Sequence, residues 1–159
     1  MADPDYELLA HQLDALTANE IDALANTANF VALLWQALPN INWLGVYVLR
    51  GNDLVLGPFQ GNPACVRIPL QKGVCGAAAS RRRSLRIANV DEFQGHVACD
   101  AKSRSELVVP LIVNDLVAGV LDIDSPHLSR FTAEDQAGIE MLCRDFSARL
   151  ESRGQQAFI

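Results

Sequence analysis

The stretch that decides the fold is Ser105-Glu106-Leu107-Val108-Val109-Pro110-Leu111-Ile112-Val113-Asn114-Asp115-Leu116-Val117-Ala118-Gly119-Val120-Leu121-Asp122-Ile123-Asp124. Its apolar residues alternate along two runs, 104–113 and 116–124, and the residues between them favour a tight turn. The pattern therefore predicts an antiparallel hairpin. On its second strand we expect two faces, one with Asp122 and Asp124 and the other with Val117, Gly119, Leu121 and Ile123.

Helical periodicity flanks this hairpin on both sides. Apolar residues recur at helical spacing over 5–18, over 20–38 and in a C-terminal helix over about 132–152. The intervening chain predicts strands over 41–50, 54–59 and 84–88, a short strand ending at Ile68, a short helix over 73–80 and a long polar loop over 89–103.

We therefore expect one α+β domain over residues 1–159. A central, largely antiparallel sheet with the functional loops takes up about 41–125. Two N-terminal helices, about 5–38, and the C-terminal helix pack against this sheet.

Charge and composition exclude several classes of protein. The 159 residues carry a formal net charge of -6, which argues against nucleic acid or an anionic membrane surface as the main partner. The acidic start Met1–Asp5 lacks a signal region, and no apolar run reaches the ~20 residues of a membrane span. A cytoplasmic protein is expected. The run Arg81-Arg82-Arg83 is interpreted as a solvated helix end.

Three of the four cysteines are candidates for chemistry. Cys143 falls in the apolar stripe of the last helix and is expected to be a core residue. The spacing of Cys65, Cys75 and Cys99 does not suit zinc, because only His96-x-x-Cys99 comes near ligand spacing. Redox chemistry fits better, and helix-dipole electrostatics alone favour Cys75 as the nucleophile. Three unrelated thiols remain the alternative.

Acidic and aromatic residues suggest a pocket near these thiols. Asp122 and Asp124 share a face, and Glu106 lies on the neighbouring strand, although all three could simply face solvent. Trp43 and Tyr47 flank Gly45 on one strand face, where they could form a concave floor or ordinary core packing. An acidic wall, an aromatic wall and a thiol would suit a small ligand with a positive amine and an electrophilic centre.

The sequence also resembles a known family, the free methionine-(R)-sulfoxide reductases, whose fold is the GAF fold. The resemblance covers about residues 20–145 and is specific because it includes the spacing of three cysteines. One departure is that residues 89–95 lack the His and the Pro that the family often has there. The matching segments are Asn42–Tyr47, Gly57–Gly61 through Ala64-Cys65, Lys72–Gly76, Gly95–Asp100, Ser105–Leu111 and Gly119–Ser125.

The resemblance implies reduction of free methionine R-sulfoxide at the expense of thioredoxin, by a homodimer without metal or organic cofactor. It implies Cys99 as nucleophile, Cys65 as main resolving thiol and Cys75 as a second one, which overrules the electrostatic choice of Cys75. It also implies that Glu106, Asp122 and Asp124 bind the substrate amine and help to protonate the sulfoxide oxygen. Trp43 and Tyr47 would enclose the methyl-sulfoxide end. Two alternatives remain: a GAF sensor of small ligands, and a thiol redox switch without turnover.

Overall fold

The computed structural model describes residues 3–155 as a six-stranded antiparallel sheet covered by helices on both faces. The strand order is β3-β2-β1-β6-β5-β4. The strands are β1 (Trp43–Arg50), β2 (Asp53–Gly61), β3 (Arg67–Pro69), β4 (Leu85–Ile87), β5 (Ser105–Val113) and β6 (Leu116–Ser125). The predicted α+β arrangement is confirmed, and the predicted hairpin is the β5–β6 pair near the centre of the sheet.

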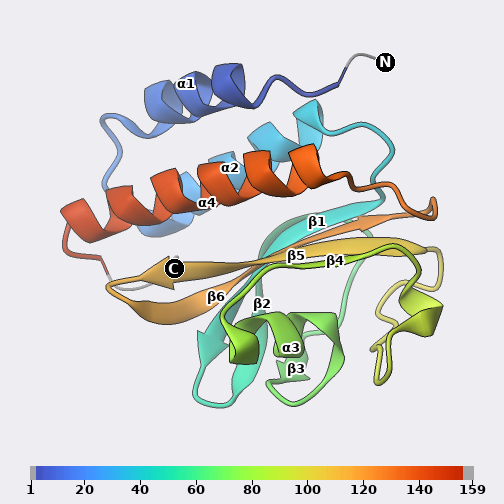
Figure 1. Cartoon of the computed structure of the whole chain (residues 1–159). Coiled ribbons are helices and arrows are strands. Elements are labelled where there is room, and N and C mark those ends of the chain that lie inside the picture. Colours follow the sequence, from blue (N-terminus) through green and yellow to red (C-terminus); the bar gives the residue numbers. More distant parts are fainter. Residues whose placement is uncertain (1–2, 156–159) are drawn as a thin grey trace.

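Helices α1 (Tyr6–Thr17), α2 (Ala23–Ala37) and α4 (Ala133–Ser152) lie on one side of the sheet, and α3 (Gly73–Arg81) lies on the other (Figure 1). Side chains satisfy the free backbone donors at three helix starts, because Asp5, Asp22 and Thr132 accept from their first turns. Only a short 3-10 turn, η1 (Val90–Glu92), interrupts the long loop between β4 and β5. The expected single domain over 1–159 stays a prediction, and residues 1–2 and 156–159 lie outside the described chain.

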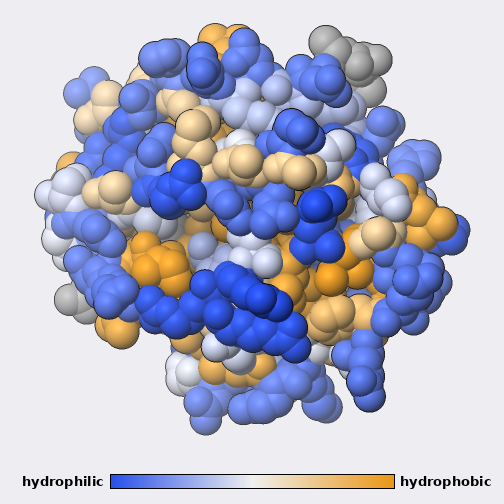
Figure 2. Space-filling view, in the orientation of Figure 1, coloured by the Kyte–Doolittle hydropathy of each residue, from blue (hydrophilic) through white to orange (hydrophobic). Residues whose placement is uncertain are grey.

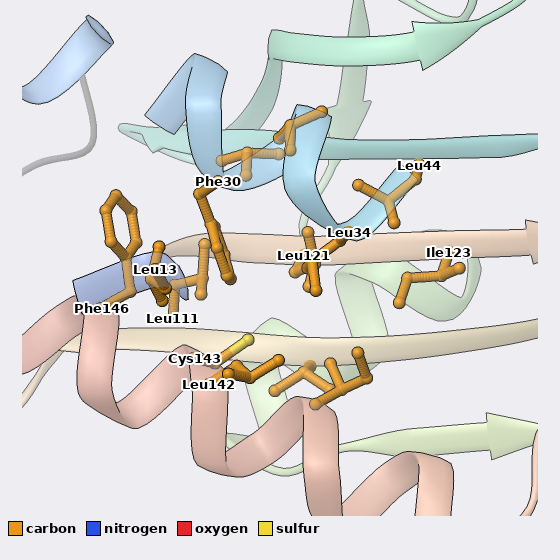
Figure 3. Packing of buried hydrophobic residues seen from close by; sticks show 14 of the residues in the cluster. Leu13, Phe30, Leu34, Leu44, Leu111, Leu121, Ile123, Leu142, Cys143 and Phe146 are labelled. Atoms are coloured by element: carbon orange, nitrogen blue, oxygen red, sulfur yellow. The ribbon is translucent and has the colours of Figure 1, made fainter. Parts of the chain in front are cut away.

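The two faces of the sheet carry separate apolar clusters. Leu44, Val46 and Val48 of β1 point toward α1, α2 and α4, where Phe30 stacks on Phe146 and Cys143 is fully packed (Figure 3). Trp43 and Tyr47 point to the α3 face. The shared face expected for Trp43 and Tyr47 is therefore confirmed, and so is the core position of Cys143. The α3 face is the one on which the candidate site lies.

One predicted face is wrong at its end. Val117 packs in the α3-side cluster and Ala118 in the opposite one, so Val117 does not share a face with Leu121 and Ile123. The register of β5 against β6 shifts between Leu111 and Ile112, and such an irregularity exchanges the two faces of a strand. The alternation beyond the shift, which places Asp122, is unaffected.

The surface bears out the interpretation of the arginine run. Arg81 lies in the last turn of α3, and residues 80–83 are exposed. Figure 2 shows strongly hydrophilic side chains beside apolar ones on the face that carries α4 and α3. A groove of about 260 Å³ there is lined by Arg82, Arg83 and Arg144 among others. Within residues 3–155, none of the helices has the length and apolar character to cross a membrane.

Candidate active site

Sheet register brings the predicted acidic and aromatic residues together. Across β1, β6 and β5, Trp43 pairs with Asp124 and Asp124 pairs with Glu106, so these three side chains form one row. In the adjacent row Asp122 pairs with Gly45. Residues paired directly across antiparallel strands point to the same face and lie about 5 Å apart. The acids therefore gather on the α3 face of the sheet instead of facing solvent.

The cysteines lie above this row in three different segments. Cys65 in the β2–β3 loop and Cys99 in the β4–β5 loop form a disulfide with a Cα–Cα distance of 5.4 Å. Cys75 lies in the first turn of α3, and its Sγ donates to Glu106 Oε1 at 4.0 Å. All three predicted cysteines thus converge on one site, and two of them are bonded to each other.

The structure corrects the electrostatic argument for Cys75. Burial raises the pKa of the Cys75 thiol well above its ordinary value, and the nearby Asp122 and Glu106 raise it further. The helix dipole is a partial charge at the end of a short helix, whereas burial beside two carboxylates disfavours the thiolate directly. The structure therefore removes the electrostatic reason for choosing Cys75 as the thiol that attacks first.

The three carboxyl groups hold protons more tightly than free acids do. Burial raises the pKa of Glu106 well above its usual range, and the charges of Asp122 and Asp124 add to the shift. Burial also raises the pKa of Asp122, to about 6, although hydrogen bonds from Glu106 and Cys75 oppose that rise. The pKa of Asp124 is raised by burial, then by Asp122 and Asp100. The raised pKa values of all three groups favour a cluster that shares protons over three separate carboxylates.

The aromatic wall is tighter than the sequence suggested. The Trp43 ring stacks between Tyr47 and Phe59, with centroid distances of 5.7 and 5.5 Å. It also covers Gly45, where an added Cβ would lie 2.5 Å from the ring. The expected concave floor over Gly45 is therefore filled by Trp43 itself. Phe59 is a member of this wall that the sequence pattern did not single out.

Hydrogen bonds fasten both cysteine loops to this floor. The Tyr47 hydroxyl donates to the backbone carbonyl of Cys65 at 2.9 Å. Asp100 Oδ2, next to Cys99, accepts from the side-chain amides of Asn42 at 3.3 Å and Asn62 at 3.4 Å. Tyr47 of β1 therefore holds the Cys65 loop, and residues next to β1 and β2 hold the Cys99 loop.

The cavity between these groups is small in the disulfide-bonded form. One hollow of about 30 Å³ is bordered by Cys75, His96, Cys99 and the three acids, among others. A second, of about 20 Å³, lies on the Trp43 and Tyr47 side and shares the Cys99 loop. Such volumes hold a water molecule but not an amino acid. The disulfide-bonded site is therefore closed to a ligand of amino-acid size.

The chain matches known proteins over nearly its whole length. A family model described as the GAF domain matches residues 10–150. The free methionine-R-sulfoxide reductase of Escherichia coli is 48% identical over 96% of this chain and 93% of its own, and that of Saccharomyces cerevisiae is 38% identical over 87% and 81%. This chain belongs to the GAF domain family. Its relatives include the free methionine-R-sulfoxide reductases.

A solved structure supports the same assignment. The reductase of Staphylococcus aureus in complex with its substrate is 45% identical to this GAF domain, with a TM-score of 0.89 over 94% of this chain and 98% of that one. The predicted GAF fold is therefore confirmed. The site described above lies on the α3 face of a GAF sheet.

Several residues of the GAF site escaped the sequence analysis. His96 Nε2 lies 3.8 Å from Glu106 Oε2, and Asn42, Asn62 and Asp100 join the loops. The sequence gives a signal for His96 through its spacing to Cys99, and for Asn42 and Asp100 only through segments that match the family.

A possible metal-ligand set also becomes visible only in three dimensions. Cys75, Glu106 and Asp122 each place one potential ligand atom within 4.8 Å of the others. Metal binding needs a deprotonated thiol, and this one is buried beside carboxylates that raise its pKa. The Cys75 thiol and the two carboxyl groups are therefore better placed to share protons with one another than to bind a metal ion.

Replacing Asp122 by Asn should change how stability depends on pH. The pKa of Asp122 is raised in the folded protein, so its contribution to stability is complete below pH 4 and is lost as pH rises through about 6. In Asp122→Asn that loss, about 2 to 3 kcal/mol, should disappear. Urea unfolding at pH 4.5 and pH 8 measures it, with exposed Asp145→Asn as control. If the difference in unfolding free energy between pH 4.5 and pH 8 is the same in Asp122→Asn, ionisation of Asp122 does not destabilise the folded protein.

Proposed function

We propose that this GAF domain reduces free methionine R-sulfoxide to methionine by thiol chemistry and that thioredoxin recycles it. One observation carries the proposal: Cys99, which is bonded to Cys65, borders a cavity that is also lined by Glu106, Asp122 and Asp124. The named activity of the relatives from Escherichia coli and Saccharomyces cerevisiae supports the same substrate. The reducing cytoplasm is the compartment that suits this cycle.

Cys99 supplies the nucleophile in this cycle. Its thiolate attacks the sulfoxide sulfur, the oxygen is protonated, and methionine leaves while Cys99 becomes a sulfenic acid. The thiol of Cys65 then attacks this sulfenic acid, which releases water and forms the disulfide. One sulfoxide and two thiols thus give one thioether, one disulfide and one water. A dithiol reductant restores the thiols by exchange, and we assign Cys75 as a second resolving thiol.

Glu106 is the proton donor for the sulfoxide oxygen. Burial and two neighbouring carboxylates raise its pKa, which favours the protonated form that a general acid needs. A general acid must be both protonated and within reach of the oxygen, and Glu106 borders the cavity together with Cys99. Asp122, with a pKa of about 6, then remains available as a negative partner of a substrate, and Asp124 lies on the same strand face.

The substrate's ammonium group binds Asp122 and Asp124 in this proposal. Asp122 Oδ1 is buried without a hydrogen-bond partner among the described residues, so an ammonium donor would satisfy it. Trp43 and Tyr47 border the other side of the cavity and would enclose the methyl-sulfoxide end. The positive amine and the apolar tail thus meet the acidic and aromatic walls respectively.

Exposed apolar residues support a homodimer through the N-terminal helices. Leu8 and Leu16 of α1, Ile21 before α2 and Leu24 in its first turn are all largely exposed, and Ile21 is 74% exposed. Neighbouring apolar side chains of this size are typical of a surface that another chain covers. We therefore propose that two copies pair through α1 and the start of α2.

Three cysteine variants test the chemistry. Cys99→Ser should abolish methionine formation with dithiothreitol as well as with thioredoxin, because the nucleophile is lost. Cys65→Ser should form methionine in the first turnover but recycle slowly. Cys143→Ser, in the core, should keep turnover and serves as control. Methionine and free thiols are counted after addition of R-sulfoxide. Full activity of Cys99→Ser would refute Cys99 as the nucleophile. Methionine formed without loss of free thiols would refute the sulfenic acid and disulfide cycle. If the unsubstituted protein forms no methionine, a ligand sensor or a thiol redox switch is favoured.

Blocking the substrate amine tests the acidic wall. Free methionine R-sulfoxide should be reduced at least about 100-fold more efficiently than the same residue inside a peptide, because the peptide lacks the ammonium group that pairs with buried carboxylates. Competing the two substrates and measuring kcat/KM for each gives the ratio. The free S-sulfoxide serves as the stereochemical control. Equal values for free and peptide-bound sulfoxide would contradict amine binding by Asp122 and Asp124.

The oligomer is tested by mass in solution. Analytical ultracentrifugation should give twice the chain mass, and Ile21→Glu with Leu24→Glu should give a monomer because two charges would be buried in the interface. Leu116→Glu is the matched control, since Leu116 is 70% exposed but lies at the β5–β6 turn. A monomer before substitution would end the proposal.

A further inference from the structure

The acidic site leaves one step of the proposed cycle without an explanation. Cys99 must lose its thiol proton to attack, yet it borders a cavity with three carboxyl groups whose charge disfavours a thiolate. Glu106 must also give up its proton, which would create a carboxylate buried beside Asp122 and Asp124. Both events need a neighbouring group that can accept positive charge.

His96 is placed to be that group. It lies three residues before Cys99 in the same loop, and both side chains border the same cavity. Its Nε2 lies 3.8 Å from Glu106 Oε2, and the two side chains are only 17% and 7% exposed. A gap of 3.8 Å closes with a small side-chain adjustment or through one water, for which the hollow of about 30 Å³ has room.

We propose that His96 is the base that accepts the Cys99 proton and that its imidazolium then pairs with the Glu106 carboxylate. The inference rests on the proposed function. The thiol proton moves to His96 as the thiolate attacks, while the Glu106 proton moves to the sulfoxide oxygen. Imidazolium and carboxylate then face each other, and His96 returns a proton to Glu106. The cavity therefore gains no net charge, and one thiol plus one sulfoxide give one sulfenic acid and one thioether.

The surroundings of His96 suit a base. Burial lowers its pKa, so the ring is neutral before the reaction, although the charge of Asp91 opposes that shift. A neutral imidazole can take a proton, whereas an imidazolium cannot. Its backbone N–H donates to the Phe93 carbonyl at 3.1 Å, which fixes where the ring enters the site. The other titratable groups around this cavity are Glu106 of β5, Asp122 and Asp124 of β6, Cys75 of α3 and Asp100 of the same loop.

The first test measures Cys99 itself, without methionine sulfoxide. Reduced protein is treated with iodoacetamide from pH 5 to 9, and mass spectrometry follows alkylation of the Cys99 peptide. His96→Gln should slow alkylation at pH 7 about 10-fold to 100-fold and move the profile to higher pH, because no imidazole then accepts the thiol proton as the sulfur is alkylated. His127→Gln, an exposed histidine, is the control and should leave the profile unchanged.

The second test measures the reaction and separates a base from a structural role. In a single turnover His96→Ala should form methionine at least about 100-fold more slowly, and added imidazole should restore part of that rate. Imidazole should not accelerate the unsubstituted protein or His127→Ala. Imidazole can restore the rate only in a folded protein, so thermal unfolding is measured for His96→Ala as well. If His96→Ala does not fold, the turnover and alkylation rates of His96→Gln decide whether His96 is the base.

The outcomes are distinct. An unchanged alkylation profile in His96→Gln, or a slow turnover that imidazole does not restore in folded His96→Ala, would overturn the role of His96. If the unsubstituted protein forms no methionine, the proposed function fails, whereas the alkylation profile still decides whether His96 acts on Cys99.

Discussion

The site depends on one electrostatic constraint, the burial of three carboxyl groups on a single sheet face. Glu106 of β5 pairs directly with Asp124 of β6, and Asp122 lies two residues before Asp124 on the same strand face, so the sheet register holds the three groups together. Like charges in a site of low dielectric cannot all ionise, so the cluster keeps a proton at neutral pH. The same constraint produces two properties that the chemistry needs: an acid that is protonated and a wall that attracts a cation.

The sheet separates this unfavourable arrangement from the groups that stabilise the fold. On β1, Leu44, Val46 and Val48 fill the cluster beneath α1, α2 and α4, while Trp43 and Tyr47 face the site. The central strands therefore contribute to an apolar cluster on each side of the sheet, and only the α3 side also carries the acids. The apolar face stabilises the strands strongly enough to hold acids on the reverse face, in agreement with the general finding that functional sites lie where stability is given up.

Patterns with a fixed period could be predicted from the sequence, and properties set by distant segments could not. Alternation along β1, β5 and β6 placed Glu106, Asp122 and Asp124 together, because side-chain direction in a strand depends only on position. The face of Val117 was wrong because a register irregularity depends on both strands. The preference for Cys75 failed since its burial comes from strands far away in sequence.

The same reasoning explains why the contacts of Asp100 were missed. Asn42 and Asn62 belong to other segments, and only the folded chain brings them to the loop. The choice of Cys99 came from the family resemblance and not from the pattern of residues. Local periodicity thus located the walls of the site but not the connections between its loops.

In the proposed cycle, the size of the cavity depends on whether the Cys65 and Cys99 loops are joined by the disulfide. The Tyr47 hydroxyl binds the Cys65 backbone and Asp100 binds the Asn42 side chain, so both cysteine loops are attached to the sheet beside the proposed substrate site. When the disulfide joins them, the space left beside the acids is about 30 Å³, too little for an amino acid. Methionine must therefore leave before or as the disulfide closes, and a reductant must open it before substrate returns. Substrate and reductant then act in alternation on one small site, without any element beyond the two loops.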